Sequence, residues 1–370
     1  MTWRERLLRV RDRWLADPRV QRWAVALPFM RPIANRNAQA LFNLCTGFVH
    51  TQVVTACVEL GLLDVLADGR LTSEAIAARI GLERDAALRL LKAAAALKLI
   101  ERSGADGYRL SELGAAMRGA AGIKELVRHN QVYYRDLADP VALLKGRAQG
   151  LALPQYWPYA QGDDGVAALE PGATTPYSAL MAATQPLIAE DVIAAFDFSK
   201  HTRLLDIGGG DGTFARTVAT ATPGLHVGVA DLPAVADLAA AAFEREGLAQ
   251  RSATHGIDFH RDTLPDGYDL MTLVRILLDH DDETVRALLR NVRAALPPGG
   301  KLLIIETMSG ARGAERLSDA YFGFYLLAMG RGRTRSLTEI KALLHEAGFS
   351  NARTITTRRS LITQVIAAQA

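Results

Sequence analysis

Cysteine is scarce in this sequence. Only Cys45 and Cys57 occur among 370 residues, too few for a disulfide framework or a cysteine-based zinc centre. No metal site is therefore expected, and the expected compartment is a reducing cytoplasm.

Long apolar runs are also missing. No uninterrupted stretch of 18 apolar residues occurs, so no transmembrane helix is expected. The first residues lack the apolar core and small-residue cleavage site of a secretory signal. Hydrophobic residues at 49% and charged residues at 22% nevertheless predict an ordinary soluble protein with ample core. A chain of 370 residues favours two domains.

Only the start of the chain has a marked excess of one sign of charge. The formal net charge is +3, but residues 1–36 contain nine arginines and three acids, a balance of +6 that leaves −3 for the rest. Nucleic acid is therefore not an expected partner of the whole protein.

Residues 2–17 predict an amphipathic helix. Trp3, Leu7, Val10 and Trp14 share one face, and five arginines cover the other sides. Two interpretations are open. The helix packs on its own protein or a dimer partner, or residues 1–30 lie on a membrane surface, with arginines on anionic headgroups.

Residues 37–115 predict a small helical domain. One helix ends at Ile80, a second covers 84–97, and a hairpin follows over 99–110. This is the winged-helix pattern, which raises a DNA-binding interpretation. The second helix is mostly alanine and leucine, however, and is better suited to packing than to contacting phosphates.

Residues 116–200 predict helices joined by aromatic-rich connections, with a proline- and glycine-rich stretch over 147–176. The aromatic residues of this region could line an apolar pocket.

After residue 201, apolar strands alternate with helices, which predicts a parallel sheet covered on both faces. The expected strands are 203–207, 227–230, 254–257, 270–273, 301–305 and 360–368, and the expected helices are 213–221, 233–246, 282–295 and 336–347.

A glycine turn follows the first of these strands. Asp206 precedes Gly208 and Gly210, and Asp231 and Asp258 stand at the ends of the next two strands. Ligands of such sheets bind beyond the carboxyl ends of the strands, so these three carboxylates predict a binding site.

Two nucleotide-like cofactors compete for this site. The dinucleotide spacing Gly-x-Gly-x-x-Gly/Ala fails from Gly208 but fits from Gly210 to Ala215, so spacing leaves NAD open. The charges favour S-adenosylmethionine, because Asp206 and Asp211 would repel a pyrophosphate.

In the S-adenosylmethionine interpretation, Asp231 accepts hydrogen bonds from both ribose hydroxyls. Asp258 accepts one from the adenine amino group, and Phe259 packs on the adenine ring. A solvated loop carboxylate is the competing interpretation of Asp258.

The motifs together resemble the small-molecule O-methyltransferases that use S-adenosylmethionine. The resemblance covers residues 37–370. It implies a class I methyltransferase domain with a Rossmann-like α/β sheet, an N-terminal winged-helix dimerisation domain, a homodimer, and Leu232 and Arg275 beside the cofactor. The residues that carry it are Asp206-x-Gly208-x-Gly210-x-Gly212, Asp231-Leu232-Pro233, Asp258-Phe259, Leu296-Pro297-Pro298-Gly299-Gly300-Lys301 and Ala347-Gly348-Phe349.

Four further stretches, 134–140, 156–160, 279–282 and 320–330, carry a second resemblance. They are similar to the carotenoid 1-hydroxy O-methyltransferases of purple phototrophic bacteria, which implies an apolar acceptor with a tertiary hydroxyl. The alternatives are a methyltransferase of another phenolic or polyketide metabolite and a winged-helix regulator.

The resemblance also shows a departure. Leu278 stands where phenol-methylating relatives carry a histidine base, whereas Glu306 is present. Asp279 is the candidate to orient the hydroxyl and take its proton, and His280 is the fallback base. The competing interpretations are a helix-capping Asp279 and a structural His280. The expected division is 1–36, 37–115, 116–200 and 201–370.

Overall fold

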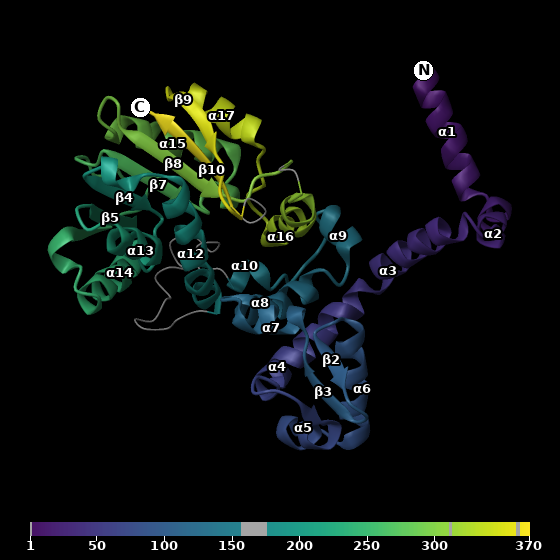
Figure 1. Cartoon of the computed structure of the whole chain (residues 1–370). Helices are drawn as coiled ribbons and strands as arrows, with labels where there is room; N and C mark the ends of the chain where they lie inside the picture. The colour runs from purple at the N-terminus through teal and green to yellow at the C-terminus, as the bar shows by residue number, and fades with distance from the viewer. Residues whose placement is uncertain (1, 157–175, 311–312, 360–362) are drawn as a thin grey trace. The chain divides into compact units, whose positions relative to one another are not determined.

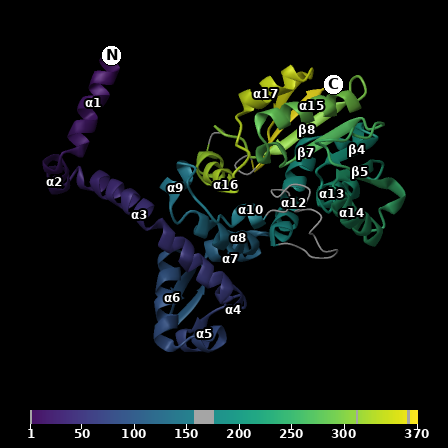
Figure 2. The same ribbon diagram turned by 180° about the vertical axis from the view of Figure 1, so that it is seen from behind.

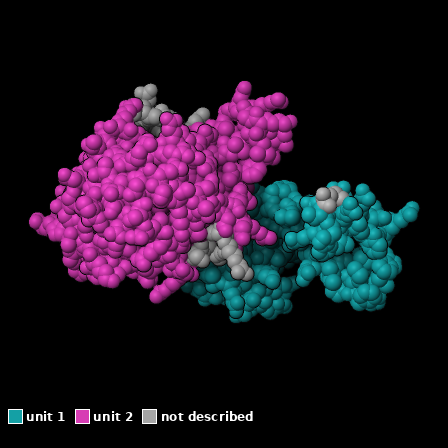
Figure 3. Space-filling model, turned by 90° about the horizontal axis from the view of Figure 1, so that it is seen from above, with its two compact units in different colours: residues 1–120 teal, residues 121–370 magenta. Residues whose placement is uncertain are grey.

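The computed structural model describes residues 2–156, 176–310, 313–359 and 363–370. The chain forms two compact units, Met1–Ala120 and Ala121–Ala370, coloured separately in Figure 3. Each unit has its own core, and the finer four-part division stays a prediction. Of the predicted aromatic stretch 156–160, residues 157–160 lie outside the described residues.

The first unit is mainly helical. Thr2 and Glu5 form a capping box at its first helix, and Asp17 caps the second, which begins at Pro18. Its helices are α1 (Trp3–Ala16), α2 (Pro18–Ala26), α3 (Arg31–Glu59), α4 (Leu62–Val65), α5 (Ser73–Ile80), α6 (Arg84–Ala96) and α7 (Glu112–Gly119).

A small antiparallel sheet completes the winged-helix pattern. Its strands β1 (Leu71–Thr72), β2 (Ile100–Ser103) and β3 (Gly107–Leu110) lie in the order β1-β3-β2. The two predicted helices and the hairpin are therefore present. Gly81 ends α5 in the left-handed conformation, with φ of 67°. The core contains Cys57, Leu62, Leu66, Ile76, Leu91, Ile100 and Tyr108.

Helix α3 meets the length and composition criteria of a membrane span. It has 29 residues and an 18-residue window of mean hydropathy 1.3, long and apolar enough to cross a bilayer by length and composition alone. Its apolar residues alternate with asparagine, glutamine and threonine, so a search for an uninterrupted run missed it. Only 11% of that window is buried within the structure.

The second unit is built on a seven-stranded sheet of order β6-β5-β4-β7-β8-β10-β9. The strands from β6 to β8 are parallel, whereas β10 runs antiparallel to both β8 and β9. The strands are β4 (Arg203–Ile207), β5 (His226–Asp231), β6 (Ser252–Gly256), β7 (Leu270–Val274), β8 (Lys301–Glu306), β9 (Ser350–Ile355) and β10 (Gln364–Gln369).

The α/β fold is confirmed, but the prediction of a wholly parallel sheet was wrong. The chain turns back after β9, and β10 inserts between β8 and β9. The edge strand β9 was not predicted, because its residues are mostly polar and exposed and show no buried alternation.

Helices cover both faces of this sheet (Figures 1 and 2). Helices α12, α13 and α14 supply or border one core cluster, and α15 and α17 pack on the opposite face. The helices of the second unit are α8 (Ile123–Asp136), α9 (Pro140–Leu144), α10 (Leu153–Tyr156), α12 (Pro176–Ala195), α13 (Thr213–Ala221), α14 (Pro233–Arg245), α15 (Asp282–Ala295), α16 (Gly323–Met329) and α17 (Leu337–Glu346).

Short helical turns complete the unit. They are the 3₁₀ turns η2 (Phe198–Lys200), η3 (Ala249–Arg251) and η4 (Leu277–Asp279) and the π-helix η5 (Arg316–Phe322). Turn η4 follows β7, and η5 leads directly into α16.

Candidate functional site

The glycine turn lies at the topological switch point of the sheet. It joins β4 to α13, and β4 pairs with β5 on one side and β7 on the other. Gly208 and Gly210 have φ of 67° and 60°, where a side chain would be strained. A Cβ on Gly209 would lie 2.8 Å from Asp206 Oδ2. The turn therefore packs bare backbone against a carboxylate at Gly209 and leaves free space at Gly210.

Asp206 is buried without a complete set of partners. Its Oδ1 accepts a hydrogen bond from Thr272 Oγ at 2.7 Å, whereas Oδ2 has no hydrogen-bond partner within the described part of the chain. Burial, reinforced by the charge of Asp231 and opposed by Thr272, raises the pKa of Asp206 to about 7. An orphaned buried carboxylate oxygen favours a cationic or hydrogen-bond-donating ligand.

Asp231 ends β5 and faces the same turn. Its Oδ2 accepts the Gly210 N–H and its Oδ1 the Leu232 N–H, both at 2.8 Å. Burial raises the pKa of Asp231 to about 6, against the effect of these two donors. Each oxygen keeps lone-pair capacity, so the carboxylate can accept two further hydrogen bonds.

Asp258 and Phe259 follow β6. The Asp258 carboxylate accepts the His260 N–H at 2.9 Å and lies 3.7 Å from the Arg261 guanidinium, so part of its capacity stabilises its own turn. A Cβ on Gly208 would lie 3.7 Å from the Phe259 ring. The structure thus brings Phe259 to the glycine turn.

Arg275 is directed towards α12. Its guanidinium donates to Thr184 Oγ at 2.9 Å and to the side-chain oxygen of Gln185. Its backbone has φ of 57° and its N–H donates to Ile305 O at 2.8 Å. A Cβ on Gly208 would overlap the side chain of the next residue, Ile276, so the strand end lies near the glycine turn. The charged group of Arg275 is held by a helix.

Turn η4 places the catalytic candidates beside β8. The Leu278 N–H donates to Glu306 Oε2 at 3.1 Å. Burial raises the pKa of Glu306 to about 7, opposed by backbone donors at Leu278 and Leu277. Burial, and then the charge of Glu306, raises the pKa of Asp279 to about 8, opposed by nearby arginines. The charge of Glu306 therefore disfavours ionisation of Asp279.

His280 faces aromatic neighbours. Its ring centroid lies 4.9 Å from that of His260 and 5.7 Å from that of Phe259. Burial, reinforced by His260, lowers the pKa of His280 to about 4. The imidazole is therefore neutral at pH 7.

Leu278 belongs to an aromatic cluster, defined here as Tyr133, Leu278, Tyr321, Phe322, Phe324, Tyr325 and Leu326 with the apolar residues packed on them. The polar ends of its tyrosines are engaged: Tyr321 donates to Asn130 at 2.9 Å, and Tyr325 lies 3.0 Å from His129 Nε2. The wall beside η4 is therefore largely apolar.

Two contributors to the site were missed by sequence reasoning. Thr272 is the one hydroxyl in the buried strand Leu270–Val274, a polarity break that could have marked it. Arg335 donates to Leu277 O and His280 O, but no sequence pattern around it marks it as part of the site. Across the described ranges no cluster of three or more His, Cys, Asp or Glu is placed to hold a metal.

Two family models match the chain. Residues 134–350 match an O-methyltransferase domain, and residues 42–118 match an O-methyltransferase dimerisation domain. The first match falls on the α/β unit and the second on the mainly helical unit.

Individual proteins match over most of the chain. Demethylspheroidene O-methyltransferase of Cereibacter sphaeroides is 42% identical over 98% of this chain and 95% of its own length. The Rhodobacter capsulatus protein of that name is 42% identical over 93% of this chain and 85% of its own length. Among solved structures, human N-acetylserotonin methyltransferase in complex with SAM has a TM-score of 0.71 at 26% identity, covering 90% of this chain and 97% of that one.

The orphaned carboxylate generates a prediction about stability. Asp206 has a raised pKa in the folded state. The stability that its protonated form gives to the fold is therefore fully present below about pH 4 and is lost as pH rises through about 7. Asp206→Asn should raise the melting temperature of the cofactor-free protein at pH 8 by a few degrees (~2–4 °C per kcal/mol), with a smaller gain at pH 5. Differential scanning fluorimetry measures this, and Asp237→Asn on α14 is the control; equal gains at both pH values would contradict it.

Proposed function

The chain belongs to the S-adenosylmethionine-dependent O-methyltransferase family, and from this premise we propose that it methylates the tertiary 1-hydroxyl of an acyclic carotenoid. The observation that carries the choice of acceptor is Leu278, which replaces a histidine base with part of an apolar wall. The 42% identity with two demethylspheroidene O-methyltransferases supports the same acceptor.

The cofactor is S-adenosylmethionine, which supplies an activated methyl group when bound. We assign its ammonium group to Asp206, whose buried Oδ2 has no partner within the described residues. Asp231 would accept the ribose hydroxyls with its remaining lone pairs. Gly210, where an added Cβ would meet nothing within 4 Å, leaves room for close approach.

The adenine end of the cofactor would lie at β6. Phe259, already beside Gly208, would pack on the ring, and Asp258 would accept from the amino group with the capacity its turn leaves. Leu232 and Arg275 would border the cofactor, the latter through its strand end, because its guanidinium is engaged by α12.

A tertiary aliphatic alcohol is a poor acid, so little alkoxide would form before transfer. Catalysis would then rest on holding the hydroxyl in line with the methyl group in an apolar site. Asp279 would orient the hydroxyl and take its proton as the oxonium develops. Glu306 holds η4 through the Leu278 N–H, and neutral His280 is the fallback acceptor.

This assignment predicts a pH dependence. Asp279 accepts a proton only when ionised, and its pKa is raised to about 8. The single-turnover rate of methyl transfer should therefore rise between pH 6 and 9. Asp279→Asn should lower the rate by about 10²–10⁴-fold and remove the dependence. An unchanged profile in Asp279→Asn, with His280→Gln as the comparison, would transfer the role to another group.

The acceptor is tested by product analysis. Incubation with S-adenosylmethionine and a 1-hydroxy carotenoid should give a product heavier by one methylene, detected by mass spectrometry. Leu278→His tests the observation that Leu278 forms part of an apolar wall. The substitution should lower this activity, because it places a polar ring in the aromatic cluster. Turnover of a phenol or polyketide alone would favour the alternative metabolite class. Salt-dependent binding to duplex DNA would favour the regulator.

The dimerisation domain supports a homodimer. On α3, Leu41, Phe42, Leu44 and Phe48 are each at least 62% exposed within the single chain. We assign this face to a second copy, since apolar patches of this kind mark contacts between proteins.

We further propose that residues 1–30 place the enzyme on the inner or photosynthetic membrane from the cytoplasmic side. Trp3, Leu7, Val10 and Trp14 of α1 are all more than half exposed, and arginines flank their stripe. Aromatic residues and arginine suit the boundary between acyl chains and anionic headgroups. A membrane-dissolved acceptor would be reached there.

Removal of residues 2–26 should abolish co-sedimentation with phosphatidylglycerol vesicles while leaving methylation of detergent-dispersed acceptor intact. Trp3→Ser with Trp14→Ser should weaken vesicle binding, and high salt should weaken it further. Leu113→Ser, an exposed apolar residue on α7, is the control. Full binding by the truncated protein would contradict the proposal.

A further inference from the structure

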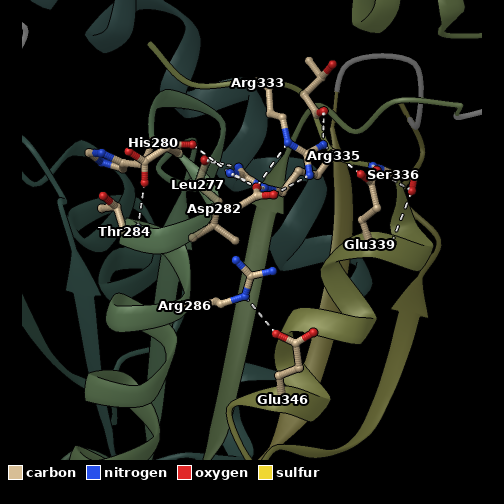
Figure 4. A network of polar contacts seen from close by, with 12 residues as sticks. Leu277, His280, Asp282, Thr284, Arg286, Arg333, Arg335, Ser336, Glu339 and Glu346 are labelled. Carbon is tan, nitrogen blue, oxygen red and sulfur yellow. Dashed lines mark hydrogen bonds and ion pairs between the residues drawn. The ribbon is translucent and has the colours of Figure 1, made fainter.

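A buried arginine stands behind the turn that carries the catalytic candidates. The side chain of Arg335 is 0% exposed. It donates to Leu277 O at 2.6 Å, to His280 O at 2.8 Å and to Asp282 Oδ1 at 2.7 and 2.9 Å (Figure 4). One guanidinium therefore joins both ends of η4 to the start of α15.

The segment before Arg335 lies directly against the same turn. A Cβ added to Gly332 would overlap Leu278 O and lie 2.7 Å from the carbonyl carbon of Asp279. Gly332 also has φ of 77°, so a side chain there is doubly unfavourable. The backbone of the segment thus limits where η4 can lie.

Glu306 also holds η4, because it accepts the Leu278 N–H at 3.1 Å. The Asp279 carboxylate has no hydrogen-bond donor among the residues that the structure describes, although it is only 8% exposed. The position of this carboxylate therefore depends on the backbone of η4, which Arg335 and Glu306 both hold, and the charges of Arg275 and Arg331 act on it as well.

We propose that Arg335 is a positioning residue for methyl transfer, fixing η4 so that Asp279 meets the acceptor hydroxyl. This inference rests on the proposed role of Asp279. Arg335 itself lies behind the turn, bonded to two carbonyl groups and Asp282, and acts on the reaction through the backbone.

The test uses a matched pair of arginines. Arg335→Lys keeps the charge but loses the planar fork that reaches two carbonyl groups and a carboxylate together. It should lower kcat by about a hundredfold, the scale of a 1 Å misplacement, with unchanged affinity for S-adenosylmethionine. Arg333→Lys is the control, because Arg333 shares Asp282 at 3.0 Å but is 43% exposed and contacts neither carbonyl. Its kcat should stay close to that of the unaltered enzyme.

A double-mutant cycle separates positioning from a general structural effect. In the Asp279→Asn background, Arg335→Lys should lower kcat little further. Multiplied losses would overturn the inference and leave the role of Asp279 intact. An Asp279→Asn enzyme with full kcat would overturn both.

Measuring the affinity for S-adenosylmethionine, with a second variant in case the first does not fold, completes the test. A fall in S-adenosylmethionine affinity that matches the loss of kcat would show a merely structural arginine and overturn the inference. Should Arg335→Lys not fold, Asp282→Asn removes its carboxylate partner at a 35% exposed position. That variant should lower kcat by about tenfold, a partial form of the same misplacement, without loss of cofactor affinity, and full kcat would contradict the proposal.

Discussion

Burying carboxylates that form no salt bridge among the described residues is the constraint on which this site depends. Asp206, Asp231, Asp279 and Glu306 are each 8% exposed or less, and burial is the largest cause of the raised pKa of each. A charged group in a low-dielectric interior is unfavourable unless other groups solvate it. The parallel strands concentrate this unfavourable charge at one edge, where a cationic cofactor and a proton-releasing acceptor would both relieve it.

The parts of the fold with strong local signals could be predicted from the sequence. The alternation of strands and helices gave β4, α13 and α15 with their observed bounds, because buried parallel strands and amphipathic helices have distinct periodicities. Strand β9 had no such signal, since its polar residues lie at the edge of the sheet. The direction of β10 depends on pairing between distant segments, which local pattern does not encode.

The candidate site divides in the same way. The glycine turn, Asp206 and Asp231 are close in sequence to strand ends, so their meeting could be predicted. Arg335 meets η4 across 58 residues of chain, and nothing in its neighbourhood of charged residues separates it from the exposed Arg333. The hydrogen bond from Arg275 to α12 could not be predicted either, because it joins residues that are far apart in the sequence.

The π-helix η5 has a consequence for how acceptor preference can change. Its wider turn holds one more residue than an α-helix needs, and it leads directly into α16, which carries Tyr325 and Leu326. Deleting one residue from η5 would let the segment wind as an α-helix with nearly the same total rotation, because seven residues of the wider turn rotate about as far as six residues of an α-helix. The flanking residues would keep their faces, and only the residues of η5 would shift. A single deletion in η5 would therefore reshape the part of the wall that Tyr321 and Phe322 form beside Leu278, leaving the methyl-donor side of the sheet untouched.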